Sequence, residues 1–191
     1  MAAFLARYSV TMLTLDDVGL QAIDASEEGA TFSEVAARKF EQYAQHVQDP
    51  YQVLFADDSG VSIDALNGEP GVKSRRWKDG KTKMSDQELI NYLLERMKDI
   101  PQGQRTARFT SSVAYGKPGD KPTVVIGEVR GVILLEPHMQ YATPGYPYRT
   151  LFYVEGEDQM LSDLEKDPTW DTHRDIAMKK MMADLGFTQQ S

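Results

Sequence analysis

The chain has 191 residues, of which 41% are hydrophobic, and its 21 basic and 29 acidic side chains give a formal net charge of −8. This length and composition suit one globular domain over residues 1–191, and the acidic balance argues against a protein that wraps a nucleic-acid backbone. The absence of cysteine excludes thiolate catalysis, disulfides and cysteine-ligated zinc.

The first quarter of the chain begins with weak signals and then gives a strong helix. Residues 2–8 are weakly helical, and no apolar run in the chain reaches the ~18 residues of a membrane helix, so we expect neither a signal peptide nor a membrane anchor. Alternating β-branched residues predict a strand over 9–15. Thr31 and Glu34 have the spacing of a capping box, and the apolar stripe that follows them predicts a helix over 31–48.

The middle of the chain contains apolar runs and a second capped helix. An apolar run over 51–56 stops at the acidic segment 57–60 and resumes over 61–66, which predicts two strands joined by a turn. Another capping box predicts a helix from Ser85 to about Lys98.

The last part of the chain is predicted to contain mostly strands and to end in a helix. Two runs of β-branched residues on either side of a Pro/Gly loop predict a hairpin of strands 105–115 and 123–135. A short strand over 151–154 and a helix over 173–185 follow. Helices alternating with strands, some parallel and some antiparallel, indicate an α/β class with at least one antiparallel hairpin.

Two acidic turns are the first candidates for chemistry. Asp57 and Asp58 follow an apolar run, and carboxylates at the end of a strand can project into a cleft, hold Mg²⁺ and orient a water. Glu27 belongs to a second acidic turn, and the two turns together would make a site for a hard cation. Structural explanations stay open: an Asp-rich turn at 57–60, and for Glu27 the favourable interaction of an acid with a helix N-terminus.

Basic side chains are candidates for binding a phosphate or a purine carbonyl, because an acidic chain needs fixed cations to receive an anion. The candidates are Lys73, Arg75, Arg76, Arg105, Arg108, Lys166, His173 and Arg174. The start of the helix over 173–185 adds backbone donors for an anion or a keto oxygen. Most isolated basic residues are merely solvated, and the aromatic loop 141–148 can stack on a base or cover a sheet edge.

The run from Ala56 to Trp77, ADDSGVSIDALNGEPGVKSRRW, resembles the signature of the inosine-triphosphate pyrophosphatase family. Further pieces follow in the family's order: Glu27-Glu28-Gly29 with Thr31-Phe32, Arg105-Thr-Ala-Arg-Phe109, Gly127-Glu128, Gly131-Val-Ile133, Gly145-Tyr146 and His173-Arg174. The resemblance covers nearly the whole chain. It implies an α/β fold with two lobes, an elongated mixed β-sheet flanked by helices, a nucleotide cleft between the lobes, Mg²⁺ as cofactor and a homodimer.

The resemblance also implies an activity and assigns residues to it. The activity is hydrolysis of ITP, dITP or XTP to the monophosphate and pyrophosphate by metal-activated water, in the cytoplasm and with no nucleic-acid or membrane partner. Asp58 matches the acid that binds metal and activates water, and Asp57 and Glu27 match the other metal carboxylates. The residues expected to bind substrate are Ser59, Arg76, Gly145, Tyr146, Lys166, His173 and Arg174.

Three departures from the family pattern keep an alternative open. The family's T/S-x-N-x-x-K loop, which contacts the triphosphate, is expected to precede the point at which this sequence begins. The family's F-G-Y-D segment is Pro144-Gly145-Tyr146-Pro147 here, and Lys166 lies two residues too far upstream of the His-Arg pair. The alternative is a catalytically weak nucleotide-binding or dimerisation homologue.

Overall fold

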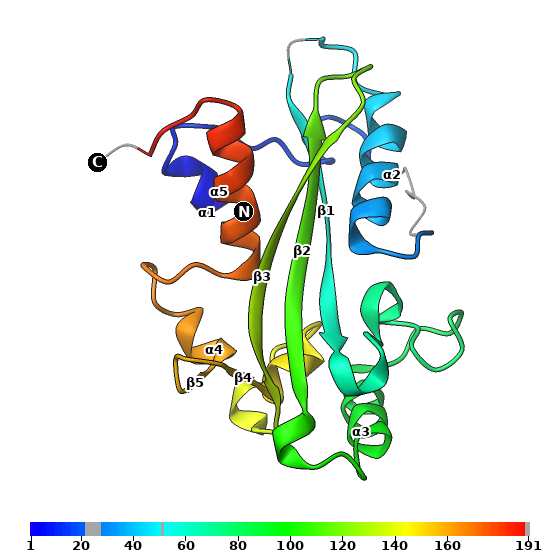
Figure 1. Ribbon diagram of the computed structural model, residues 1–191. Coiled ribbons are helices and arrows are strands. Elements are labelled where there is room, and N and C mark those ends of the chain that lie inside the picture. The colour runs from blue at the N-terminus through cyan, green and yellow to red at the C-terminus, as the bar shows by residue number, and fades with distance from the viewer. Residues whose placement is uncertain (22–27, 51, 190–191) are drawn as a thin grey trace. The chain divides into compact units, whose positions relative to one another are not determined.

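The computed structural model describes residues 1–21, 28–50 and 52–189. In this part of the chain, five strands form one antiparallel sheet in the order β1-β2-β3-β4-β5 (Figure 1). The strands are Leu54–Ile63 (β1), Thr106–Gly116 (β2), Thr123–Ile133 (β3), Phe152–Val154 (β4) and Gln159–Met160 (β5). The α-helices are Ala2–Ala6 (α1), Phe32–Ala44 (α2), Asp86–Arg96 (α3), Leu161–Leu164 (α4) and His173–Asp184 (α5). Short 3₁₀ helices lie at Asp64–Leu66, Gly71–Lys73, Gln102–Gln104, Met139–Tyr141 and Pro147–Thr150.

The predicted α/β class is confirmed, as is the antiparallel hairpin of β2 and β3. The sheet itself is antiparallel, so the parallel pairs expected of a mixed sheet do not occur among the described strands. The order of the strands in the sheet follows their order in the chain, and the short connections from β2 to β3 and from β4 to β5 allow only antiparallel pairing.

The chain divides into two compact units, in agreement with the two lobes that the resemblance implies. The first unit comprises Met1–Ser59, Ser111–Gly127 and His173–Ser191, and the second comprises Gly60–Thr110 and Glu128–Thr172. Each of the strands β1, β2 and β3 contributes residues to both units.

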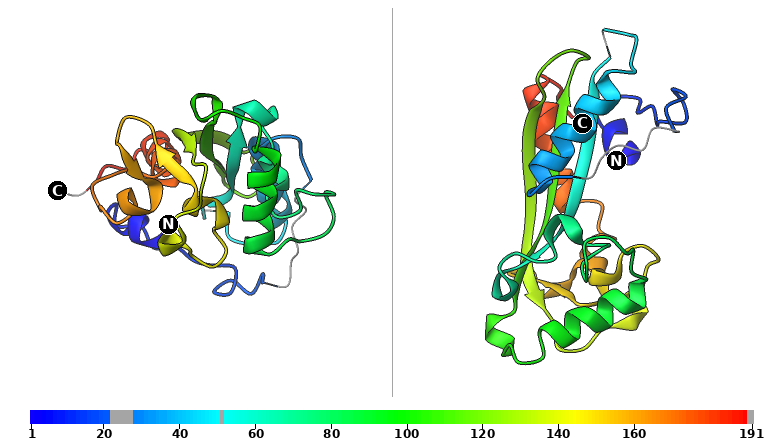
Figure 2. Two further views of the ribbon diagram at one scale, coloured as in Figure 1. Left: turned by 90° about the horizontal axis from the view of Figure 1, so that it is seen from below. Right: turned by 90° about the vertical axis from the view of Figure 1, so that its right-hand side faces the viewer.

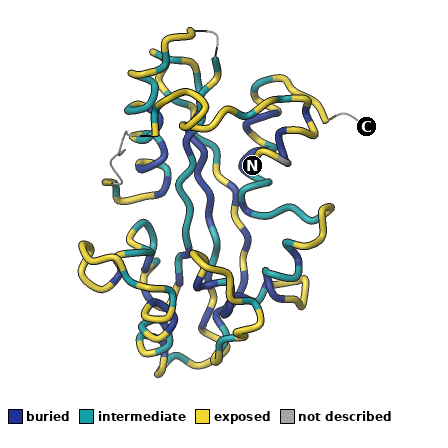
Figure 3. The backbone as a smooth tube through the Cα atoms, turned by 180° about the vertical axis from the view of Figure 1, so that it is seen from behind, coloured by how far each residue is buried: buried dark blue, intermediate teal, exposed yellow. Residues whose placement is uncertain are grey.

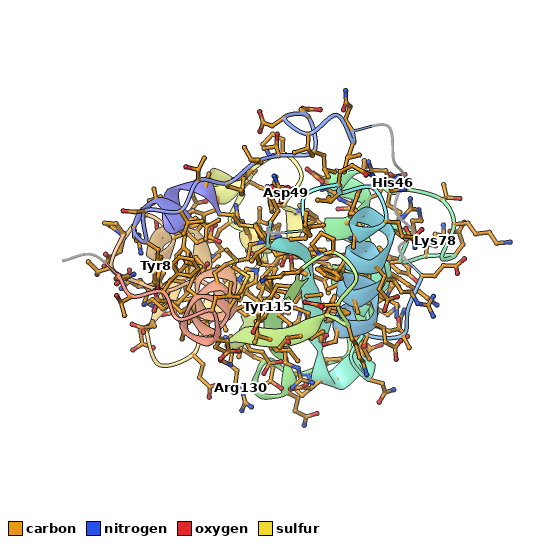
Figure 4. The ribbon with its side chains drawn as sticks, turned by 90° about the horizontal axis from the view of Figure 1, so that it is seen from above. Tyr8, His46, Asp49, Lys78, Tyr115 and Arg130 are labelled. Carbon is orange, nitrogen blue, oxygen red and sulfur yellow. The ribbon has the colours of Figure 1, made fainter. Side chains whose placement is uncertain are left out.

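In the first unit, helices cover both faces of the sheet (Figures 2 and 4). On one face, Phe40 of α2 packs in a buried cluster with Ala114 of β2. On the other face, Met178 of α5 packs with Val113 and Tyr115 of β2 and with residues of α1. Neighbouring residues of β2 thus pack on opposite faces, as the two-residue period of a strand requires.

The second unit has its own apolar core. Helix α3 contributes fully buried Leu89 and Leu93, and the strand side contributes fully buried Ile133 and Phe152. Buried and half-buried residues predominate along the three long strands, whereas exposed residues are frequent in the loops (Figure 3). No helix in the described ranges is both long and apolar enough to cross a bilayer.

Both capped helices begin where the sequence predicts. Thr31 accepts a hydrogen bond from the backbone N–H of Glu34, and Ser85 forms a complete capping box with Glu88. Helix α2 ends at Ala44 rather than at residue 48, and α3 ends at Arg96. The short elements β5 and α4 were not predicted, because two and four residues are too few to show a period.

The predicted strand over 9–15 is wrong. Val10 and Met12 pack against the cluster of α1 and α5, which explains their apolar character. The segment pairs with no strand of the described sheet. Instead, the backbone N–H and the hydroxyl of Thr14 both donate to the Asp17 carboxylate at 2.7 Å, and this local bonding closes a turn.

The predicted turn at 57–60 is also wrong, because β1 runs without a break from Leu54 to Ile63. Polar residues in a row favour a turn only when they lack partners inside a sheet. Here the three side chains before Gly60 are hydrogen-bonded to side chains of β2, α2 and α5, so the backbone stays extended.

Candidate active site

Asp57 and Asp58 are adjacent in sequence, but their side chains lie on opposite faces of the sheet within the first unit. In strand β1 side chains alternate, so Asp57 is directed to the α5 face with Phe55, and Asp58 to the α2 face with Ala56. Both carboxylates are equally sheltered, with 15% of each side chain exposed. The structure therefore differs from the expectation that the two acids share one site at the end of a strand.

On the α5 face, Asp57 is the centre of a hydrogen-bond network. Its Oδ1 accepts from the Ser111 hydroxyl of β2, and its Oδ2 accepts from Ser59 at 3.0 Å and from Arg174 Nε at 3.2 Å. Arg174 Nη2 also donates to the Ser59 hydroxyl at 2.6 Å. Three of the predicted site residues, Asp57, Ser59 and Arg174, thus lie together, although Ser111 was not predicted.

On the α2 face, Asp58 forms an ion pair with Lys39. Lys39 Nζ lies 2.8 Å from Asp58 Oδ1, and 17% of the lysine side chain is exposed. Lys39 was not among the predicted site residues, although its position in the helix indicates a role. Lys39 lies four residues after buried Val35 and three after buried Ala36, so it is a cation on the helix face that packs on the sheet.

The start of α5 is held close to β3 by a glycine. A Cβ on Gly127 would lie 2.1 Å from the His173 carbonyl oxygen and 2.5 Å from the Ala177 backbone nitrogen, so no larger residue fits there without movement. This contact fixes the first turn of α5, with His173 buried and Arg174 directed to Asp57. The predicted pair at the helix start is therefore placed partly by the backbone of β3.

The expected metal site is only partly covered by the structure. Glu27 lies outside the described residues. Among the residues that are described, no group of three or more His, Cys, Asp or Glu side chains is arranged to hold a metal ion. Mg²⁺ does not require such a group, since in nucleotide enzymes it is bound by one or two carboxylates, several waters and substrate phosphates. The carboxylate of Asp58 fits that chemistry.

The remaining predicted residues belong to the second unit. Gly145 donates its backbone N–H to Asp86 Oδ2 at 2.8 Å, and Asp86 also forms an ion pair with Arg75. Burial acts to raise the pKa of Asp86, but these two donors prevail and hold it below the ordinary value. Arg76, which follows a short 3₁₀ helix, lies at the surface.

The loop that carries Gly145 is tied to the segment that carries Arg75 by a second contact. The buried Tyr148 hydroxyl donates to the Ser74 carbonyl oxygen at 3.0 Å, and burial raises the pKa of that phenol. The two loops, which are far apart in the sequence, are thus hydrogen-bonded to each other.

Tyr146 is an exposed aromatic ring with a cation stacked on it. The Arg149 guanidinium carbon lies 4.1 Å from the ring centroid, and Arg149 Nη2 forms a 2.8 Å ion pair with Glu165. Lys166 pairs instead with Asp163 at 2.7 Å, and 70% of its side chain is exposed. Arg149, which was not predicted, orders the ring of Tyr146, whereas Lys166 has an ordinary surface ion pair.

Known proteins resemble this chain over most of its length. The Ham1 family profile matches residues 1–184. The dITP/XTP pyrophosphatase of Bacillus subtilis is 39% identical over 159 residues, which is 83% of this chain and 76% of that protein. The dITP/XTP pyrophosphatase of Escherichia coli K12 is 32% identical over 188 residues, 97% of this chain and 90% of that protein.

Solved structures show the same fold. The Staphylococcus aureus Ham1 protein superposes with a TM-score of 0.78 at 29% identity, covering 96% of this chain and 91% of that one. The nucleoside-triphosphatase, or dITP/XTP pyrophosphatase, of Mycobacterium abscessus gives a TM-score of 0.69 at 29% identity, covering 97% and 92%.

Proposed function

This chain belongs to the Ham1 family, and from that membership we propose that it hydrolyses dITP, ITP and XTP to the corresponding monophosphate and pyrophosphate. The observation that carries the proposal is the similarity to dITP/XTP pyrophosphatases at 32–39% identity over at least four-fifths of the chain. Asp58 lies within the Ala56–Trp77 stretch that resembles the family, and its ion pair with Lys39 supports the mechanism proposed below.

Asp58 is proposed as the residue that orients and deprotonates the attacking water. In-line attack on a phosphorus atom requires a nucleophile held by a base and neutralisation of the charge that develops on the phosphate oxygens. The ammonium group of Lys39, 2.8 Å from Asp58, stabilises the ionised carboxylate and fixes its position. The same cation can then interact with a phosphate oxygen.

Mg²⁺ is proposed as the cofactor, with Asp58 and Glu27 as the carboxylates that would hold it. When bound, the ion would neutralise charge on the triphosphate and lower the pKa of water. Asp57 is a weaker candidate ligand, because its oxygens accept hydrogen bonds from Ser111, Ser59 and Arg174 on the opposite face of β1.

Arg174 and His173 are proposed to recognise the purine. Hypoxanthine and xanthine carry a keto oxygen at the 6-position, where adenine has an amino group, so a guanidinium donor favours them over adenine. In the second unit, Tyr146 with its stacked Arg149 offers an aromatic ring for a base, and Gly145, Arg76 and Lys166 remain proposed substrate contacts.

The proposal extends to assembly and location. We propose that residues 1–191 act as one pyrophosphatase-like domain, that two copies form a homodimer, and that the protein works in the cytoplasm on free nucleotides. The lack of cysteine suits a reducing compartment, and the net charge of −8 disfavours nucleic acid as a partner.

The test is a pyrophosphate-release assay with dITP, XTP, ITP, GTP and ATP in the presence of Mg²⁺. We expect turnover of dITP, ITP and XTP well above that of ATP. Release from none of the five would contradict the proposal. Tight binding of ITP by calorimetry without turnover would instead support the alternative, a nucleotide-binding homologue with little catalytic power.

A further inference from the structure

Asp57 is hydrogen-bonded to Ser59, Ser111 and Arg174, and the proposed activation of water by Asp58 uses none of these contacts. We propose that Asp57 is a positioning residue, which fixes the Arg174 guanidinium for recognition of the purine base. The inference rests on the proposed function and deepens it, since it divides the labour of two adjacent aspartates between substrate recognition and water activation.

The geometry of Arg174 supports this role. An arginine side chain is long and flexible, and a free one would occupy many rotamers. Here Arg174 is held at two points along one edge of its guanidinium group, by Asp57 Oδ2 at 3.2 Å from Nε and by the Ser59 hydroxyl at 2.6 Å from Nη2. Since a guanidinium group has five N–H donors, these two bonds set its plane and use only part of its capacity.

Asp57 is itself held by the interior of the sheet. Its Oδ1 accepts from the hydroxyl of Ser111, a fully buried residue in the middle of β2, and its Oδ2 accepts from Ser59. The residues that hold Arg174 in place therefore belong to the neighbouring strands β1 and β2 and not to a loop. Groups held by regular secondary structure are placed more accurately than groups on loops.

Because side chains alternate along β1, the contacts of Asp57 lie on the opposite face of the sheet from the proposed catalytic pair, Asp58 and Lys39. Asp58 and Lys39 lie on the α2 face, so neither contributes to the contacts that Asp57 makes on the α5 face. A change at Asp57 should consequently alter substrate binding and leave the chemical step nearly intact. This is the expected signature of a positioning residue for recognition, and it differs from that of a metal ligand, whose loss reduces kcat.

The first experiment compares Asp57→Asn, Arg174→Ala and the double variant in the full chain with dITP as substrate. For Asp57→Asn we expect KM to rise about 10-fold and kcat to change less than about 2-fold. For Arg174→Ala we expect KM to rise about 50-fold. Adding Asp57→Asn to this variant should change KM less than about 2-fold further, because both substitutions remove the same interaction.

Two further variants keep the experiment decisive. Ser59→Ala removes the 2.6 Å contact with Arg174 and the 3.0 Å contact with Asp57 but keeps both charged groups, and it should raise KM about 3-fold, which tests the network even where Asp57→Asn folds poorly. Asp184→Asn is the matched control. It makes the same chemical change at the far end of α5, where the Tyr115 hydroxyl donates to Asp184 at 2.7 Å, and it should leave KM and kcat unchanged.

Contradictory results are equally specific. A fall in kcat with unchanged KM in Asp57→Asn, or strictly additive effects of Asp57→Asn and Arg174→Ala, would overturn the positioning role and favour Asp57 as a metal ligand. Absence of turnover in the wild-type protein would overturn the proposed function instead. The positioning role would then be decided by the affinity for IMP in calorimetry, which Asp57→Asn should weaken about 10-fold and Asp184→Asn should not change.

Discussion

Arg105 shows how a single cation can serve the fold rather than a ligand. Only 1% of this residue is exposed, and its guanidinium donates to four backbone carbonyls of the second unit, those of Met97, Ile100, Ile133 and Leu134. It was a candidate for phosphate binding because its charge is visible in the sequence and its burial is not. In the fold, it joins the end of α3 to the end of β3.

The first prediction concerns Arg105→Gln. Loss of the guanidinium leaves several buried carbonyls without donors, so we expect the free energy of unfolding to fall by about 3 kcal/mol or more in urea denaturation. Arg108→Gln is the control. That arginine is partly exposed and lies 3.6 Å and 3.9 Å from its carboxylate partners, and its replacement should cost less than about 0.5 kcal/mol. Equal losses in the two variants would refute the structural role of Arg105.

The second prediction concerns the proposed catalytic pair. Asp58→Asn keeps the shape of the side chain and removes its basicity, so kcat for dITP should fall by about 10²–10⁴-fold. KM should change little, in contrast to the expectation for Asp57→Asn. Steady-state kinetics of both variants in parallel would measure this difference, and identical effects would show that the two aspartates share one role.

At the scale of elements, the parts that follow local rules could be predicted and the parts that depend on partners could not. Capping-box spacing predicted the starts of α2 and α3, and β-branched alternation predicted β2 and β3. The acidic segment of β1 was taken for a turn, because the Ser111 and Lys39 contacts that satisfy it come from distant parts of the chain.

The same distinction applies to the candidate site. Asp57, Ser59 and Arg174 were predicted as site residues from the resemblance, and the structure brings them together. Asp58 lies on the other face because side chains alternate along β1. This could not be predicted, because the segment was expected to be a turn and not a strand. Lys39 was missed because one lysine in a capped helix resembles an ordinary solvated residue until its face of the helix is known.

The third prediction concerns the contact between β3 and α5. In Gly127→Ala the new methyl group would meet the His173 carbonyl at 2.1 Å and force the first turn of α5 away, so we expect a lower melting temperature and a raised KM for dITP. Gly103→Ala is the matched control, because nothing lies within 4 Å of its Cβ position and its φ is not positive. A melting temperature unchanged in Gly127→Ala would show that the helix adapts without loss.

At the scale of the whole molecule, the net charge of −8 disfavours the approach of a triphosphate, which is itself anionic. Both partners are anionic, and long-range repulsion lowers the rate of their encounter unless a cation intervenes. Local cations such as Arg174 and Lys39 are engaged with Asp57 and Asp58, and this is consistent with the proposed use of Mg²⁺ as an additional source of positive charge.

The fourth prediction follows from this charge balance. Removal of divalent ions with EDTA should abolish pyrophosphate release, and added Mg²⁺ should restore it. The circular dichroism spectrum and melting temperature should stay unchanged, because the cores of both units consist of apolar side chains such as Phe40 and Phe152. Full activity in EDTA would refute the metal dependence, and unfolding in EDTA would indicate a structural ion.

The placement of the consecutive residues Asp57 and Asp58 on opposite faces of the sheet also has a consequence for the evolution of substrate specificity. In the proposed division of roles, base preference depends on the α5 side of β1 and hydrolytic rate on its α2 side, so a substitution on the α5 side would broaden or narrow the range of nucleotides without disturbing the reaction itself. An insertion or deletion of one residue in β1 would exchange the two sides and destroy both properties together. We therefore expect new specificities in this scaffold to arise through substitutions around Arg174, and engineering libraries to be most productive there, with the length of β1 kept constant.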